Sequence, residues 1–161
     1  MNNYQEIEGN LITLAQEGAF DVIAHGCNCF STMGAGIAPQ MAKAFGCDNY
    51  PLEKTKSIHP INKLGQIDYI MHNVFIENKL KYTFAIVNAY SQYHFGHKNG
   101  PPFDLEAFTL CMRKMNHIFK GKHIGLPQIG AGLAGGKWGK IQHVIMRELT
   151  DCKVTVVIYK P

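Results

Sequence analysis

The sequence predicts an α/β protein, a three-layer α/β/α sandwich around a mixed, mostly parallel central sheet. Short continuous apolar segments rich in β-branched residues, typical of strands buried on both faces, lie at 22–24, 124–126 and 154–159. Stretches with apolar residues at helical spacing lie at about 36–45, 104–119 and 138–149. Because strand and helix alternate along the chain, we expect helices to cover both faces of the sheet.

Length and composition predict a single domain over residues 1–161. Of the 161 residues, 46% are hydrophobic and 17% are charged, which is enough apolar material for one core and too little for two. The formal net charge of +4 comes from lysines spread along the chain, so it favours an anionic ligand without identifying nucleic acid, which we do not expect as a partner. The odd number of cysteines, with no disulfide-like spacing, signal peptide or long apolar run, predicts a protein of the reducing cytoplasm and no membrane partner.

The predicted elements follow one another in the order β-β-α-β-β-α-β-α-β. Besides the three strands above, strands are expected at about 4–8, 69–76 and 82–88. The polar segment 77–81 separates the last two of these and predicts an antiparallel hairpin. Two segments, 48–68 and 90–103, lack periodicity. The second is rich in aromatic residues and is either a functional flap or a plain connecting loop.

Two glycine-rich loops each lie where an apolar strand ends and a helix begins. The first glycine loop comprises Met33, Gly34, Ala35, Gly36, Ile37 and Ala38, and the second runs over 130–136. Glycine lets main-chain N–H groups approach a phosphate, and the helix N-terminus adds donors and the positive end of its dipole. Neither loop matches a dinucleotide fingerprint or a P-loop. One such loop is more often an ordinary turn, but two in one α/β sheet predict two phosphates at the carboxyl ends of the strands.

Polar residues just before the first glycine loop are candidates for chemistry. The carboxamide of Asn28 can bind sugar hydroxyls, although an asparagine here can equally form a turn. His25 can act as a general acid or base, the alternative being a hydrogen-bonded structural histidine. His25, Cys27 and Cys29 could face one side of an extended chain, but a fourth zinc ligand is missing. We therefore expect neither metal nor cofactor and interpret the cysteines as small buried residues.

Four segments in this order resemble the macro domains, a family that binds ADP-ribose. They are Gly9-Asn10-Leu11, 22–28, 33–38 and 126–133, and the resemblance spans nearly the whole chain. The segment from His25 to Ala38 is most similar to the branch that contains yeast ADP-ribose 1''-phosphate phosphatase and the ADP-ribosyl-glutamate hydrolases. Its Cys-Asn-Cys element favours the phosphatase.

The resemblance implies that the ligand is ADP-ribose, and it assigns residues to each part of that ligand. Asn10 and the amide of Leu11 would hold the adenine end, the first glycine loop would wrap one phosphate, and Asn28 would meet the distal ribose. The other phosphate would be held by Gln128, Ile129, Gly130, Ala131, Gly132 and Leu133. The implied partners are ADP-ribose, ADP-ribose 1''-phosphate or an ADP-ribosylated protein.

The function we expect is removal of the terminal phosphate from ADP-ribose 1''-phosphate, with Asn28 orienting the ribose and His25 as the acid or base. Two departures from the family favour a binding module without catalysis instead. No lysine occurs at the end of the strand near 88–92, and the acid of the second loop would fall at Ala134. A third alternative is hydrolysis of an ADP-ribosyl adduct by substrate-assisted attack of water.

Overall fold

The computed structural model describes residues 3–54, 58–96, 100–132 and 134–160. In chain order its strands and helices are β1 (Tyr4–Gly9), α1 (Leu11–Gln16), β2 (Val22–Asn28), α2 (Ala38–Phe45), α3 (Pro51–Lys54), β3 (Ile67–Ile76), β4 (Lys79–Gln92), α4 (Leu105–Ile118), β5 (His123–Leu126), α5 (Trp138–Glu148) and β6 (Lys153–Tyr159). Two short 3-10 helices, Cys47–Asn49 and Pro60–Lys63, flank α3. No helix in the described part of the chain is long and apolar enough to cross a membrane.

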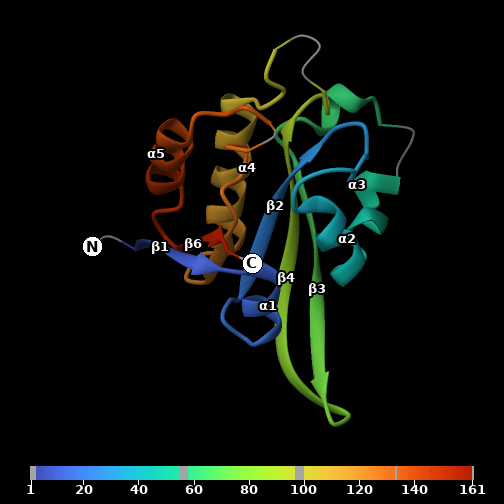
Figure 1. The fold of residues 1–161 in the computed structure, drawn as a ribbon, viewed down its shortest axis with the longest axis vertical. Helices are drawn as coiled ribbons and strands as arrows, with labels where there is room; N and C mark the ends of the chain where they lie inside the picture. Colours follow the sequence, from blue (N-terminus) through green and yellow to red (C-terminus); the bar gives the residue numbers. More distant parts are fainter. Residues whose placement is uncertain (1–2, 55–57, 97–99, 133, 161) are drawn as a thin grey trace.

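The strands form one six-stranded sheet in the order β1-β6-β5-β2-β4-β3. The neighbours from β1 to β4 pair in parallel, and β3 alone is antiparallel to its neighbour β4. Figure 1 shows α4 and α5 on one side of this sheet and α2 and α3 on the other. The predicted three-layer sandwich with a mixed, mostly parallel sheet is confirmed.

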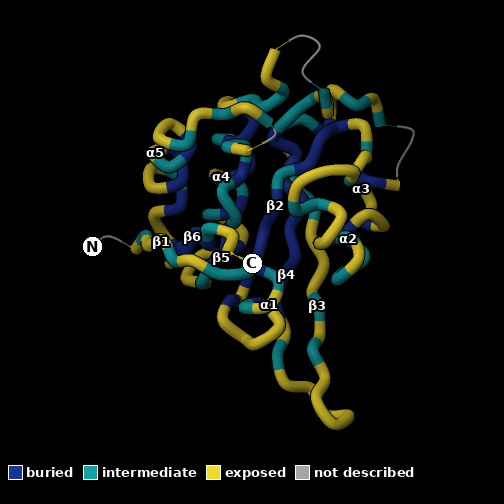
Figure 2. The backbone as a smooth tube through the Cα atoms, in the orientation of Figure 1, coloured by how far each residue is buried: buried dark blue, intermediate teal, exposed yellow. Residues whose placement is uncertain are grey.

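Strand β2 shows why the central strands are continuously apolar. Val22 and Ala24 pack into the cluster formed with α4 and α5, whereas Ile23 between them packs into the cluster formed with α1 and α2. Successive residues of a strand point to opposite faces, so a strand covered on both faces needs apolar residues at every position. Figure 2 shows β2 and β4 as buried along most of their length within the sheet.

Two parts of the chain contain helices that the sequence did not predict. The segment after Asn10 forms helix α1, because the Asn10 Oδ1 atom accepts a hydrogen bond from the Thr13 N–H at 3.1 Å and caps the helix. The helix has only six residues, too few for a periodic pattern to show. The aperiodic segment 48–68 likewise contains α3 and the second 3-10 helix, and both are too short to be predicted from spacing.

The predicted hairpin is present and longer than expected. Strands β3 and β4 pair over all ten residues of β3, and Glu77 and Asn78 both have positive φ, at 51° and 64°. Positive φ at both central residues is the geometry of a type I′ turn, whose twist matches that of paired strands. Figure 1 shows the hairpin extending beyond the rest of the molecule.

Candidate functional site

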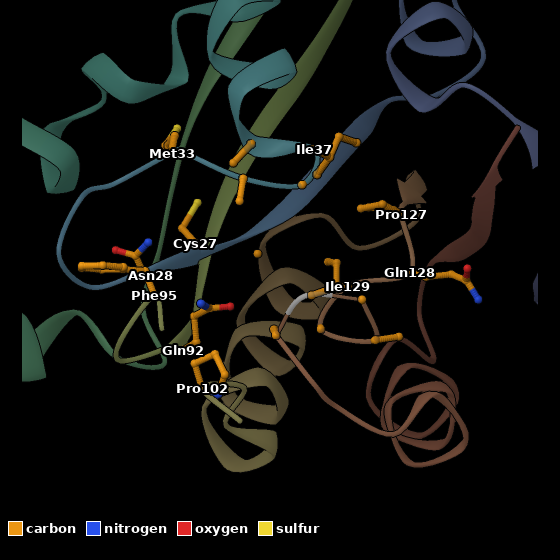
Figure 3. Close-up of a pocket in the computed structure, with 18 of the residues that line it drawn as sticks. Cys27, Asn28, Met33, Ile37, Gln92, Phe95, Pro102, Pro127, Gln128 and Ile129 are labelled. Carbon is orange, nitrogen blue, oxygen red and sulfur yellow. The ribbon is translucent and has the colours of Figure 1, made fainter. Parts of the chain in front are cut away.

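A cavity of about 930 Å³ opens at the carboxyl ends of β2 and β5. It lies between the two glycine loops, which are almost a hundred residues apart in the sequence but follow neighbouring strands. Figure 3 shows Met33 and Ile37 of the first loop, Ile129 just before the second, and Asn28 with Phe95 at one end. This is the edge of the sheet at which open α/β proteins collect their ligands.

Most of the predicted ligand-binding residues line this cavity. They are Asn28, Met33, Gly34, Ala35, Gly36, Ile37, Ala38, Gln128, Ile129, Gly130, Ala131 and Gly132. Leu133 lies outside the described residues. Asn10 caps α1 and Leu11 is buried in the core, and neither is among the residues that line the cavity.

The first glycine loop leads into α2 without a side-chain cap. Ile37 is the N-cap residue of α2, and its side chain makes no hydrogen bond to the first turn. The first N–H groups of a helix have no partner within the helix, so here they remain available to an anion. A Cβ atom added at Gly34 or Gly36 would meet nothing within 4 Å, although Gly36 has a φ of +65°. Packing therefore gives no reason for a glycine at Gly34.

The second glycine loop is more tightly built. Gly130 has a φ of +76°, and a Cβ atom there would press against the Phe103 ring. The loop closes through a 2.6 Å hydrogen bond from the Gly136 N–H to the Gly130 carbonyl. Gly132 is different, because a Cβ atom there would meet nothing within 4 Å. Helix α5 then begins without a side-chain cap, as α2 does.

Among the described residues that line the cavity, the only ionisable side chains are those of Cys27 and Tyr159. None of these lining residues is a lysine, an arginine, a histidine or an acidic residue, and Ala134 is one of them. A phosphate in this cavity would be bound by main-chain N–H groups and by the N-termini of α2 and α5. The arrangement is suited to holding an anion and supplies no evident general acid.

Asn28 forms the turn that precedes the first glycine loop. Its Nδ2 donates to the Thr32 carbonyl at 2.7 Å and to the Thr32 Oγ1 at 2.8 Å. Its Oδ1 accepts from the Phe30 N–H at 2.9 Å and, more weakly, from the Thr32 N–H at 3.4 Å. Both the nitrogen and the oxygen of the carboxamide are therefore hydrogen-bonded within the turn. This matches the alternative in which Asn28 forms a turn. Asn28 still borders the cavity, where its place in the turn sets the course of the loop.

His25 lies in the core and does not reach the cavity. It is fully buried, and its Nε2 lies 2.7 Å from the Asn88 Oδ1. Burial lowers the pKa of His25 to about 4, and the bond to Asn88 opposes this shift only in part. The structure therefore does not support His25 as the acid or base, and places it as the hydrogen-bonded structural histidine. The sequence could not separate these alternatives, because both faces of β2 are covered.

The cysteines next to His25 do not form a metal site. Cys27 and Cys47 place their Sγ atoms 3.5 and 3.6 Å from the His25 Nε2, while Cys29 turns elsewhere and contacts the Gln92 carbonyl. Burial raises the pKa of the Cys27 thiol well above its usual value. Within the described ranges, no group of three histidine, cysteine or acidic side chains is arranged to hold a metal ion.

A cluster of buried polar side chains contacts Ser31, which lies in the turn that Asn28 forms. Lys63 is almost fully buried, and its Nζ donates to the Ser31 Oγ at 3.2 Å. The Tyr90 hydroxyl donates to Glu53 at 2.9 Å and lies 3.5 Å from Asp68. Burial raises the pKa of the Glu53 and Asp68 carboxyl groups. Ser31 has a φ of 59°, so the cluster holds a strained residue at the edge of the site.

Several lining residues were not predicted from the sequence. Among them are Gln92, Phe95, Pro102, Trp138 and Tyr159. The first three belong to the aperiodic segment 90–103, which borders the cavity, and its residues 97–99 lie outside the described part. Tyr159 ends β6, so the rule that ligands lie at the carboxyl ends of parallel strands could have found it.

The fold is that of the macrodomains. A DarTG protein from Thermosipho africanus, solved in complex with ADP-ribose, matches with a TM-score of 0.73 and 17% identity, over 100% of this chain and 42% of that one. The macrodomain of Mycobacterium tuberculosis DarG matches with a TM-score of 0.65 and 18% identity, over 98% of this chain and 97% of that one. At these identities the likeness concerns the fold alone. No protein-family model matches the chain.

A protein of Enterobacteria phage T4, described as an uncharacterized 17.5 kDa protein in the tk-vs intergenic region, is 31% identical over 159 residues. The match covers 96% of each chain. The chain therefore belongs to the family of this phage protein, and it has the macrodomain fold.

Proposed function

We propose that the protein binds ADP-ribose in the cavity, with the diphosphate between the two glycine loops. One observation carries the proposal: two helix N-termini without side-chain caps, each preceded by a loop with an open glycine, converge on a single cavity. Two such donor sets match the two phosphates of a diphosphate. The DarTG neighbour of the same fold was solved with ADP-ribose, which supports this choice of ligand.

The pairing of β1 with β6 suggests where the adenine lies. Gly9 pairs with Tyr159, which lines the cavity, so Asn10 and Leu11 follow directly beside that end of the site. We assign the adenine to this end and the distal ribose to the end that Asn28 and Phe95 border. Asn10 would then act through its main chain, because its side-chain oxygen already caps α1.

Phosphate release from ADP-ribose 1''-phosphate is a second candidate, supported by the likeness of the segment from His25 to Ala38 to the phosphatase branch. With His25 buried, the reaction would depend on water held by main-chain groups and by the substrate itself. Incubation with ADP-ribose 1''-phosphate and measurement of released inorganic phosphate tests it. Incubation with ADP-ribosylated protein and detection of free ADP-ribose tests the hydrolase alternative. Binding of ADP-ribose without either product would leave the protein as a binding module.

Isothermal titration calorimetry with the variant Gly132→Glu tests the binding site. The new side chain would place bulk and a negative charge where a phosphate is expected, so we predict an affinity at least about 100-fold lower. Since Gly132 has open space around it, the unfolding temperature should change little. Met146→Glu is the control, because it adds the same charge at an exposed residue of α5 that lies two turns from the helix N-terminus and does not line the cavity.

We expect one ADP-ribose per chain for the wild type and for Met146→Glu, and strongly weakened binding for Gly132→Glu. If Gly132→Glu binds as well as the control, the diphosphate does not lie between the loops. If the wild type does not bind ADP-ribose at all, the proposed ligand is wrong.

A further inference from the structure

Strand β3 is an open edge of the sheet. It is the last strand in the order, so its outer main-chain groups have no strand partner within the described residues. Large apolar side chains between 40% and 61% exposed follow this edge and the adjoining hairpin. We call this set the apolar edge: Tyr69, Ile70, Met71, Phe75, Ile76 and Leu80. The eight residues from Tyr69 to Ile76 include no charge and no proline.

The opposite edge of the sheet is built differently. Strand β1 carries the exposed carboxylates Glu6 and Glu8, which bind Gln142 at 2.9 Å and Lys160 at 2.8 Å. Charged residues on an edge strand discourage pairing with another chain. Strand β3 lacks this protection over its whole outer length beyond Asp68. An edge without such protection is suited to pairing with another strand.

Helix α4 extends the same surface. Leu110 packs beside Gly65 just before β3, and the Lys114 Nζ donates to the Gly65 carbonyl at 2.7 Å. Ile118 lies two turns beyond Leu110 on the same side of the helix, and both side chains are exposed. The Tyr69 ring also contacts Phe119 at the end of α4, with ring centroids 5.0 Å apart. The apolar edge therefore continues onto a helix that flanks it.

We propose that the apolar edge is the interface with a second copy of this chain, formed by antiparallel pairing of the two β3 strands. Two identical strands related by a two-fold axis must run antiparallel, and such a contact closes on itself without further growth. The six side chains of the apolar edge and the two of α4 expose on the order of 700 Å² together, close to the roughly 800 Å² per partner of a standard interface.

Strand geometry restricts the register of this pairing. Residues directly opposite each other in an antiparallel pair point to the same face of the sheet, so the two-fold axis must pass through a residue and cannot lie between His72 and Asn73. An axis through Asn73 meets this requirement and sets Met71 opposite Phe75 and Ile70 opposite Ile76. This is the register we propose, and it places Asn73 opposite its own copy.

Sedimentation velocity of the full chain tests the interface. We expect the wild type to sediment at twice its 18.0 kDa mass at high concentration. Met71→Lys should raise the dimer dissociation constant at least about 10-fold, because it buries an unpaired charge. Met146→Lys is the matched control: Met146 is a similarly exposed methionine, on α5, and its replacement should change nothing.

Oxidative cross-linking tests the register. Asn73→Cys should form a disulfide between two copies, whereas Met146→Cys should not; the five native cysteines are buried. A wild type that stays monomeric up to about 200 μM, where interfaces of this size are occupied, would overturn the proposal. Equal weakening by the two lysine variants, or no cross-link at residue 73, would also contradict it. Unchanged ADP-ribose affinity in Met71→Lys is expected, since the cavity lies elsewhere.

Discussion

The two glycine loops occupy equivalent places at the ends of β2 and β5, but their glycines are needed for different reasons. In the second loop, a Cβ atom at Gly130 would press against the Phe103 ring and one at Gly136 against the Gly130 carbonyl. In the first loop, Gly34 has open space and an ordinary φ. The second loop therefore depends on glycine for its packing, whereas the first does not depend on Gly34 at all. A glycine with no structural requirement points more strongly to a ligand.

The strands beneath the loops differ as well. Strand β2 ends at Asn28 and contains a fully buried histidine bonded to Asn88, whereas Ile124–Leu126 of β5 are buried and apolar. The first loop is thus anchored by hydrogen bonds and the second by close packing. We therefore expect acid to lower the stability of the region around the first loop. In the second loop, we expect a larger side chain in place of glycine to lower stability.

The largest effect is expected from the packed loop. Gly130→Ala forces a residue with a Cβ atom into left-handed backbone and against the Phe103 ring, so the free energy of unfolding should fall by about 3 kcal/mol. Chemical denaturation measures this change. Gly139→Ala is the control, and it should leave stability unchanged or raise it by up to about 1 kcal/mol, because alanine favours the helix. Equal stability of both variants would remove the distinction between the loops.

A comparable effect is expected from the anchor of the first loop at low pH. An unfolded chain takes up a proton on His25 near pH 6.5, but the folded protein does so only near pH 4, because the ring is buried. The stability that the neutral ring contributes is therefore complete above pH 6.5 and is lost as the pH falls to 4. The loss amounts to about 3 kcal/mol.

Comparison with His25→Gln isolates this effect, since the raised pKa values of Glu53 and Asp68 act in the opposite sense in both proteins. Denaturation curves recorded between pH 7 and 4 should show that the wild type loses more stability than the variant. Parallel pH profiles would mean that His25 is protonated in the folded protein, and that the first loop has a different anchor.

The smallest effect on stability is expected at the open glycine of the first loop. Gly34→Ala should change the free energy of unfolding by no more than about 0.5 kcal/mol, yet lower ADP-ribose affinity about 10-fold by keeping a phosphate from the main chain. Gly36→Ala should also cost about 1 kcal/mol of stability, because Gly36 has a φ of +65°. Calorimetry on both variants would settle whether the first loop meets a ligand. Unchanged affinity in both would show that it does not.

The sequence predicted the sheet and the three longest helices because their signals are local and repeated. The apolar runs of β2, β5 and β6 and the helical spacing in α4 and α5 needed no knowledge of neighbours. Helix α1 was missed because its six residues depend on a cap at Asn10 and on burial of Leu11 and Ala15. A short helix stabilised mainly by tertiary packing leaves little pattern in the sequence.

The two glycine loops could be found from the sequence, because their main-chain geometry leaves a local pattern, and both line the cavity. Their role in binding stays a prediction. The sequence left two alternatives open for His25, because a strand covered on both faces has no polar side that shows where a side chain points. Phe95 reaches the cavity only through the path of the segment after β4, which no local pattern specifies. Gln92 lines the cavity because β4 continues beyond the predicted strand and ends there.

A crystal structure with ADP-ribose tests most directly the claim that the main chain of the two loops holds one diphosphate. We expect both phosphates to lie between the loops, within about 3 Å of main-chain N–H groups of the first and second glycine loops, with no lysine or arginine in contact. A diphosphate bound outside this cavity, or held by basic side chains, would contradict it.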